Sequence, residues 1–305
     1  MMMKEPSRFT TLRGKLTHGT SLARYTSWHC GGPADALYVP ADHDDLGTFV
    51  RQLDPREPLT VVGLGSNLLV RDGGVRGTVV VVHAALNRLE LHGSMVYAEA
   101  GVASPKVARF AATHGLEGAE FLAGIPGTVG GALAMNAGCY GGETWHCVAR
   151  VEVLTRIGIF ETRVPSDYRI GYRTVLRADG HPPDGIFTAA WLAFARGDGD
   201  AARRRITEFL KRRIATQPLE LPNAGSVFRN PDGDHAARLI ERCGLKGHAI
   251  GGARVSEKHA NFIVNPGAGA RAADIEALIA HVRATVLQKT GVLLEPEVRV
   301  IGEPA

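Results

Sequence analysis

The sequence predicts an α+β fold with domain boundaries near residues 84 and 215. Two observations support this prediction. Runs of β-branched and apolar residues have the length and composition of strands, and they occur at 59–62, 68–70, 78–82, 96–100, 151–154, 187–194, 260–264 and 293–301. Apolar residues recur at helical spacing in other segments, namely 105–114, 201–216, 235–243 and 272–290. No internal repeat or low-complexity segment interrupts this pattern.

The first strands enclose a glycine-rich loop. The apolar run 59–62 ends in Gly63-Leu64-Gly65-Ser66-Asn67 and resumes at 68–70, and residues 71–74 are typical of a turn. The order is therefore strand, glycine loop, strand. A Rossmann dinucleotide-binding motif needs a third glycine and a following helix, so the sequence argues against that fold.

A second glycine-rich stretch, 121–143, has no clean period and is predicted to be an ordered loop with one short helix near 130–134. The later helix 201–216 should bury an apolar stripe, formed by Ile206, Phe209, Leu210 and Ile214. Its clusters of basic residues are interpreted as a solvated face. The helix 272–290 is amphipathic, with Ile275, Leu278, Ile279, Val282 and Val286 on one side.

Composition narrows the class of protein. The net charge of +4 is mild for 305 residues, so it suits a small anionic ligand and does not call for nucleic acid. The four cysteines form no C-x-x-C pair, which predicts reduced thiols and no zinc or other metal site. The first residues lack the apolar core of a signal peptide, and no apolar run is long enough to span a membrane. We expect a cytoplasmic protein.

Each glycine loop can bring several backbone N–H groups toward one anion. The first loop adds the side chains of Ser66 and Asn67, and the second is Gly124-Ile125-Pro126-Gly127-Thr128-Val129-Gly130-Gly131, which leads to Asn136. Together the loops could clamp the two phosphates of a dinucleotide. Either loop could instead be a tightly packed turn.

These motifs resemble the flavin-binding half of the UDP-N-acetylenolpyruvoylglucosamine reductase (MurB) family. The similarity runs in order from about Tyr25 to Gly302, and the segment 25–34 is similar to the family's opening segment. The resemblance implies an FAD-binding fold of the vanillyl-alcohol-oxidase (PCMH) type. It implies two FAD-binding subdomains, 1–83 and 84–215, and a C-terminal α+β substrate-binding domain, 216–305, whose last strand could pack back on the FAD domain.

The resemblance also implies three catalytic residues. Ser226, in Ala224-Gly225-Ser226-Val227, matches the family's proton donor, and Glu297, in Glu295-Pro296-Glu297-Val298, matches its catalytic glutamate. Arg173 matches the arginine that binds the substrate carboxylate, although Val175 stands where the family usually has serine. The neighbouring pair Tyr168-Arg169 offers a rival register. Strand alternation would place Glu295, Glu297 and Arg299 on one face.

The remaining site residues follow from the same match. Non-covalent FAD would be bound by Gly63, Gly65, Ser66, Asn67, Leu68, Gly124, Ile125, Pro126, Gly127, Thr128, Gly130, Gly131 and Asn136. The substrate would be bound by Tyr172, Arg229 and Asn230, of which Arg229 replaces the family's usual lysine.

The implied activity is the NADPH-dependent reduction of UDP-N-acetylglucosamine enolpyruvate to UDP-N-acetylmuramate, a step of peptidoglycan synthesis. A monomer of the family's shorter type, which lacks an extra tyrosine loop, is expected. One alternative is an oxidase of the same FAD fold that acts on a sugar or alcohol, with flavin attached through His29 or Cys30. Another is a non-catalytic nucleotide-binding module.

Overall fold

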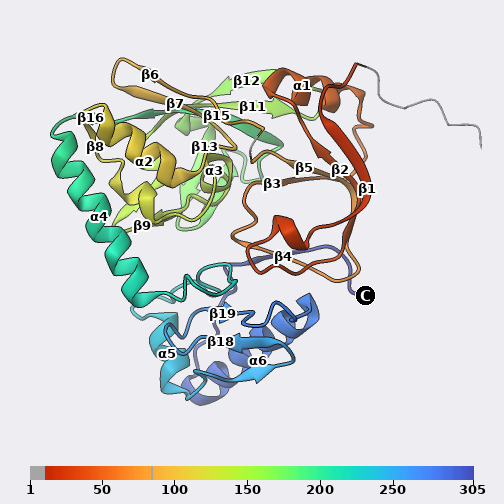
Figure 1. The fold of residues 1–305 in the computed structure, drawn as a ribbon, viewed down its shortest axis with the longest axis vertical. Coiled ribbons are helices and arrows are strands. Elements are labelled where there is room, and N and C mark those ends of the chain that lie inside the picture. The colour runs from red at the N-terminus through yellow and green to blue at the C-terminus, as the bar shows by residue number, and fades with distance from the viewer. Residues whose placement is uncertain (1–10, 84) are drawn as a thin grey trace, which may run out of the picture. The chain divides into compact units, whose positions relative to one another are not determined.

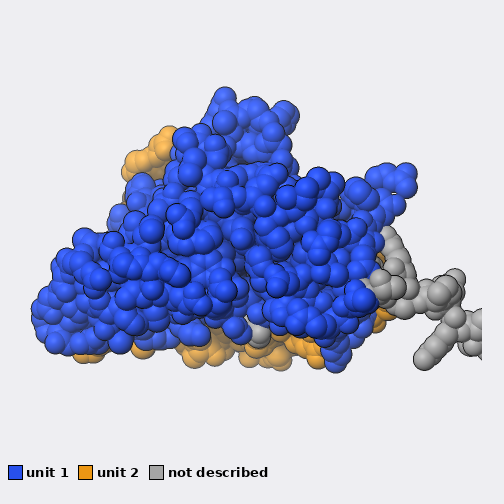
Figure 2. All heavy atoms as spheres, turned by 90° about the horizontal axis from the view of Figure 1, so that it is seen from above, with its two compact units in different colours: residues 1–17, 36–63, 77–206 blue, residues 18–35, 64–76, 207–305 orange. Residues whose placement is uncertain are grey.

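The computed structural model describes residues 11–83 and 85–305. Its helices and strands appear in Figure 1. The chain forms two compact units, shown in different colours in Figure 2. Within the described residues, unit 1 contains 11–17, 36–63 and 77–206, and unit 2 contains 18–35, 64–76 and 207–305. The division into three domains at residues 83 and 215 stays a prediction.

A five-stranded antiparallel sheet is the centre of unit 1. Its strands, in spatial order, are β12 (Phe160–Arg163), β11 (Val148–Thr155), β15 (Gly185–Ala193), β7 (Met95–Glu99) and β6 (Leu89–His92). The run Ile186–Ala190 of β15 is buried without alternation, so both faces of this strand are covered. Helices α2 (Ser104–Thr113) and α3 (Val129–Met135) pack on the sheet.

A second sheet has the order β1, β2, β5, β3, with bounds Lys15–Ser21, Pro33–Val39, Val75–Val81 and Leu59–Val62. Helix α1 (His43–Gln52) begins after Asp42, whose carboxylate accepts a hydrogen bond from Asp45 N at 2.9 Å. Its buried face, with Leu46 and Phe49, joins a core to which Val80 and Leu154 also belong. This core packs α1 against strands of both sheets.

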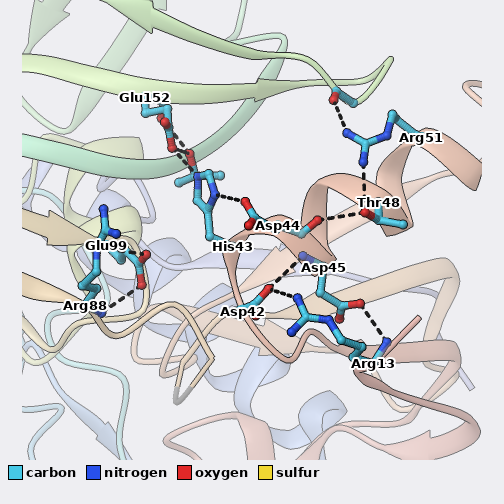
Figure 3. A network of polar contacts seen from close by, with 12 residues as sticks. Arg13, Asp42, His43, Asp44, Asp45, Thr48, Arg51, Arg88, Glu99 and Glu152 are labelled. Carbon is cyan, nitrogen blue, oxygen red and sulfur yellow. Dashed lines mark hydrogen bonds and ion pairs between the residues drawn. The ribbon is translucent and has the colours of Figure 1, made fainter. Parts of the chain in front are cut away.

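An ion pair ties α1 to β11 (Figure 3). His43 Nε2 lies 2.5 Å from Glu152 Oε1, and Thr188 donates a hydrogen bond to the same oxygen at 2.7 Å. The His43 ring stacks on Phe160 with 4.0 Å between centroids. Burial favours neutral His43, but the bonds to Glu152 outweigh it and raise the pKa of His43. Burial alone would raise the pKa of Glu152, but the bonds from His43 and Thr188 hold that pKa below its ordinary value.

Unit 2 has its own core. Helices α5 (Ala236–Arg242) and α6 (Ala272–Thr290) pack with a three-stranded sheet, whose strands are β17 (Ala249–Ile250), β18 (Ala253–Val255) and β19 (Ile263–Val264). Trp28 is fully buried in this core, and its Nε1 donates to Ile263 O at 2.8 Å. The predicted apolar side of 272–290 is confirmed, since all five residues are buried.

Short elements complete the two units. They are η1 (Ala23–Tyr25), β4 (Leu68–Val70), β8 (Leu116–Glu117), η2 (Glu120–Gly124), β9 (Gly138–Cys139), β10 (Gly142–Glu143), η3 (Thr144–His146), η4 (Pro165–Asp167), β13 (Tyr168–Gly171), β14 (Thr174–Arg177), β16 (Ala195–Arg196) and β20 (Arg299–Ile301). The long helix α4 is Gly199–Thr216.

Among the described residues, no helix is long and apolar enough to cross a membrane. All four cysteines are free thiols.

Two predicted strands are shorter than expected. Only residues 263–264 of 260–264 and 299–301 of 293–301 are strand. Pro296 has no N–H to donate, and the N–H groups of Glu297 and Val298 both point to Val227 O, so the alternation predicted for 295–299 breaks there.

The predicted apolar stripe of α4 is also partly wrong. Ile206 is buried, whereas Ile214 is 64% exposed. The basic side of the helix is not simply solvated. Arg205 forms ion pairs with Glu117 and Glu120.

Candidate active site

The two glycine-rich loops meet in unit 1, at Gly63 and Thr128. A Cβ on Gly63 would lie 2.4 Å from Thr128 Oγ1, which leaves no room for a side chain. The close approach therefore requires glycine at this end of the first loop.

The rest of the first loop, in unit 2, leaves backbone donors available. Gly65 has a φ of +61°, and a Cβ there would lie 2.0 Å from Tyr25 O, so only glycine fits. The carbonyl of Gly65 accepts from Ser27 N at 3.3 Å. Within the described residues, the N–H groups of Ser66 and Asn67 have no internal acceptor. These donors, with the Ser66 hydroxyl, fit phosphate or carbonyl oxygens of FAD.

The second loop is only partly available to a ligand. The N–H of Val129 donates to Val102 O and that of Gly130 to Ala100 O, at 2.8 and 2.9 Å. A Cβ on Gly130 would lie 2.8 Å from Ala100 Cβ. Gly130 thus serves close packing, and its N–H is not free to bind the flavin as the sequence reasoning expected.

Gly124 also serves close packing, because a Cβ there would lie 2.5 Å from Cys139 Sγ. The N–H of Ile125 donates to Leu122 O. In the described part of the chain, the N–H groups of Gly127 and Thr128 bond no internal acceptor, so this end of the loop fits a bound anion.

Asn136 does not fit its predicted role as a flavin ligand. It is fully buried at the end of α3, in a left-handed conformation with a φ of +43°. Its Nδ2 donates to Glu143 Oε2 and Gly171 O at 2.9 and 3.0 Å, and its Oδ1 accepts from Trp145 N at 3.2 Å. The side chain is therefore committed to internal partners.

Arg173 lies in the turn between β13 and β14, with an unusual positive φ of +54°. Its Nη1 and Nη2 donate to the carbonyls of Asn136 and Gly138 at 3.3 and 2.8 Å. The guanidinium lies over the ring of Tyr172, 5.1 Å from its centroid. Arg169, the rival, is exposed on β13. The fixed geometry of Arg173 favours it as the anion-binding arginine.

Ser226 follows a glycine that sets the path of the chain. Gly225 has a φ of +74°, and its N–H donates to Asn223 Oδ1 at 2.9 Å. After Ser226, the N–H of Val227 donates to Asn261 O, and the Asn261 side chain bonds both the N–H and the carbonyl of Phe228. Buried Asn261 thus holds the residues that follow the serine.

The chain brings the serine segment beside Glu297. The N–H of Glu297 donates to Val227 O at 2.7 Å, and Phe228 forms a bridge with Pro296. Ser226 and Glu297, 71 residues apart by their numbers (297 minus 226), therefore lie on neighbouring backbone segments of unit 2.

Arg229 and Asn230 have structural contacts of their own. The N–H of Arg229 donates to Glu295 O at 2.9 Å, and Asn230 Oδ1 accepts from Ala236 N at the start of α5. Burial and the positive charge of Arg229 lower the pKa of Arg299. Sequence reasoning placed Arg299 on one strand face with Glu295 and Glu297 but assigned no site role to it or to Asn261.

Comparison with known proteins decides the family. Residues 34–162 match the model of an FAD binding domain, and residues 217–301 match the C-terminal domain of UDP-N-acetylenolpyruvoylglucosamine reductase. The reductase of Nitrosospira multiformis is 58% identical over 97% of this chain and 91% of its own length. That of Thiobacillus denitrificans is 56% identical, over 96% and 94%. The chain belongs to the UDP-N-acetylenolpyruvoylglucosamine reductase family.

A solved member of this reductase family has the same fold. The MurB structure from Thermus caldophilus superposes with a TM-score of 0.80 and 36% identity, and covers 95% of this chain and 99% of its own. The predicted family and the FAD-binding α+β fold are thereby confirmed. The chain is an FAD-dependent oxidoreductase of peptidoglycan precursor synthesis.

The surroundings of Cys30 argue against covalent attachment of flavin to this cysteine. The thiol is 6% exposed, and burial raises its pKa to about 11, so little thiolate would exist at neutral pH. A protonated thiol is a poor nucleophile toward a flavin.

Proposed function

We propose that this reductase converts UDP-N-acetylglucosamine enolpyruvate to UDP-N-acetylmuramate with NADPH, as a cytoplasmic monomer of the shorter type. Ser226, Arg173 and Glu297 are its catalytic residues. The observation that best supports this assignment is the hydrogen bond from Glu297 N to Val227 O, because it gives the proposed proton donor and the proposed carboxylate a common support.

Bound in the glycine loops, FAD would supply hydride chemistry between the nicotinamide and the terminal carbon of the enolpyruvyl group. Arg173 binds the substrate carboxylate, toward which negative charge develops. A guanidinium can pair both oxygens of a carboxylate at once. Because backbone carbonyls already orient the Arg173 side chain, little reorganisation is needed when this charge appears.

Ser226 donates the proton to the carbon adjacent to the one that receives hydride. An alkyl hydroxyl is a weak acid, so it needs cationic or hydrogen-bonding neighbours to act in this way. Arg229, three residues further along, is the nearest such cation in sequence. Glu297 stabilises the developing charge if it carries or shares a proton.

Tyr172, Arg229 and Asn230 bind the remainder of the substrate. Tyr172 is 48% exposed and can present its ring to a ligand. Asn230 contributes its amide hydrogens, since its oxygen accepts from Ala236 N. The flavin is bound through the loops 63–68 and 124–131, in which the donors of Ser66, Asn67, Gly127 and Thr128 are available.

The test is a spectrum of the purified protein followed by two additions. We expect flavin absorbance at about 450 nm, a property of FAD itself. The colour should bleach under anaerobic NADPH and recover when the enolpyruvyl nucleotide sugar is added. No flavin spectrum would identify a nucleotide-binding module instead. Bleaching by a sugar or alcohol, with recovery in oxygen alone, would identify an oxidase, and colour retained in acid-precipitated protein would show covalent flavin.

A further inference from the structure

The side-chain amide of Asn136, a fully buried residue, is engaged by internal partners through both its nitrogen and its oxygen. Both hydrogens of its Nδ2 are used, toward Glu143 Oε2 and Gly171 O, and its oxygen accepts from Trp145 N. The reverse amide orientation would set its oxygen against two acceptors, so this arrangement is chemically unambiguous. Its left-handed backbone is one that asparagine tolerates.

Two bonds join Asn136 to the turn that carries Arg173. Gly171, bonded by the Asn136 side chain, lies two residues before Arg173, and the Arg173 guanidinium donates to the carbonyl of Asn136 itself. The turn is therefore held from both sides by one residue. Glu143 fixes the amide plane of that residue from β10, and its side chain is only 29% exposed.

We propose that Asn136 and Glu143 are positioning residues that fix the Arg173 guanidinium for the substrate carboxylate. This inference rests on the proposed role of Arg173. Neither residue needs to contact the substrate, because each acts through the turn 171–173. A displacement of about 1 Å in a substrate-binding group can cost on the order of 100-fold in rate, so a loosened turn should be visible in kinetics.

The decisive variant is Asn136→Asp. It keeps size and backbone preference but replaces the Nδ2 donor with an oxygen that faces the Glu143 carboxylate and the Gly171 carbonyl. We expect full FAD content, flavin reduction by NADPH within about threefold of wild type, and a loss on the order of 100-fold in flavin reoxidation by substrate. The apparent KM for the enolpyruvyl substrate should rise, because a displaced Arg173 binds its carboxylate less well.

A second substitution that restores the lost hydrogen bond can distinguish a role in positioning Arg173 from a general loss of stability. In the double variant N136D/E143Q, a glutamine amide can donate to the new carboxylate, so we expect at least tenfold recovery of reoxidation. Glu143→Ala alone, at a half-buried site, removes one acceptor and should slow reoxidation about tenfold. Asn265→Asp is the matched control, because Asn265 is equally buried and donates to Trp28 O in unit 2. It should lower stability and leave the ratio of the two half-reaction rates unchanged.

Stopped-flow measurement of the two half-reactions distinguishes the possible failures. If the wild type is not reoxidised by the substrate, the proposed function is wrong and this inference falls with it. If the wild type is reoxidised and Arg173→Ala is too, at the full rate, the reductase function stands, but the role of Arg173 is wrong and the positioning inference falls with it. If the wild type is reoxidised and Arg173→Ala is not, two results would overturn the positioning role. One is equal slowing of the two half-reactions in N136D, and the other is no recovery of reoxidation in N136D/E143Q.

Discussion

The side-chain amide of Asn67 donates a hydrogen bond to the main-chain carbonyl of Glu297 over 3.2 Å. The carbonyl of Asn67 accepts from Arg299 N at 3.0 Å, and β4 and β20 continue this contact as a parallel pair. The first glycine loop and the proposed catalytic glutamate are thus joined within unit 2. Asn67 therefore has a second role beside the one expected from the glycine motif.

Asn67→Ala should lower turnover more than flavin affinity. A hydrogen bond of this kind contributes about 0.5–1.5 kcal/mol, so we expect a roughly 2- to 10-fold fall in kcat with substrate and less than a threefold change in the Kd of FAD. Flavin fluorescence titration and steady-state kinetics give the two values. A large loss of FAD affinity with unchanged kcat would instead make the Asn67 side chain a flavin ligand.

Ser226→Ala should separate the two half-reactions. Flavin reduction by NADPH should stay fast, while reoxidation by the enolpyruvyl substrate should slow by about 10²- to 10⁴-fold, the usual loss on removing a general acid. Stopped-flow absorbance resolves both steps. Ser94→Ala, at an exposed serine in the β6–β7 turn, is the control. Equal slowing of both steps in S226A would refute the proton-donor role.

The His43–Glu152 pair should make stability depend on pH. The pKa of His43 is raised in the folded state, so its contribution is complete below about pH 6.5, its unfolded value, and is lost as pH rises through the folded pKa. The pKa of Glu152 is lowered, so its contribution is lost only as the solution becomes acidic. We expect wild type to lose about 1–2 kcal/mol of unfolding free energy between pH 6 and 9 from this pair.

His43→Gln tests that expectation, because an amide can still donate to Glu152 but does not titrate. The difference in unfolding free energy between wild type and H43Q, from denaturant titrations, should shrink as pH rises from 6 to 9. A difference that stays constant across this range would mean that the pair does not change its charge there.

Arg205 should stabilise η2, the short helix that leads into the second glycine loop. It donates to Glu120 at 2.6 Å and Glu117 at 2.9 Å, and the Glu120 side chain is 9% exposed at the start of η2. Arg205→Met leaves that carboxylate without its cation, so both Tm and FAD affinity should fall. Arg204→Met, at an exposed neighbour 3.7 Å from Asp198, should change neither. Similar Tm values for the two variants would contradict this role.

The spacing and composition of residues predicted helices and strands well where each element depends mainly on its own sequence. The helix 272–290 has the bounds that its apolar spacing indicated, and 59–62 and 68–70 are strands as their composition suggested. Residues 293–298 failed this test, because Pro296 and the shared acceptor Val227 interrupt the strand, and Val227 lies about 70 residues earlier in the chain.

The site residues were harder to predict than the helices and strands. A position next to a glycine motif does not show which groups the side chain contacts. Asn67 and Asn136 both follow glycine motifs, so both were assigned to the flavin. Asn67 bonds Glu297, 230 residues away, and Asn136 bonds Gly171, 35 residues away, besides its nearer partners Glu143 and Trp145. Such pairings depend on the folded chain and carry no local signal in the sequence.

Helix α3 has only seven residues between Thr128, which begins it, and Asn136, which ends it. One end joins the second glycine loop and the other supports the Arg173 turn. Each residue added or removed would rotate Asn136 by about 100° and shift it about 1.5 Å along the axis. The helix thus acts as a spacer of fixed length, so an insertion or deletion within it should displace the Arg173 turn even where every side chain of the turn is kept.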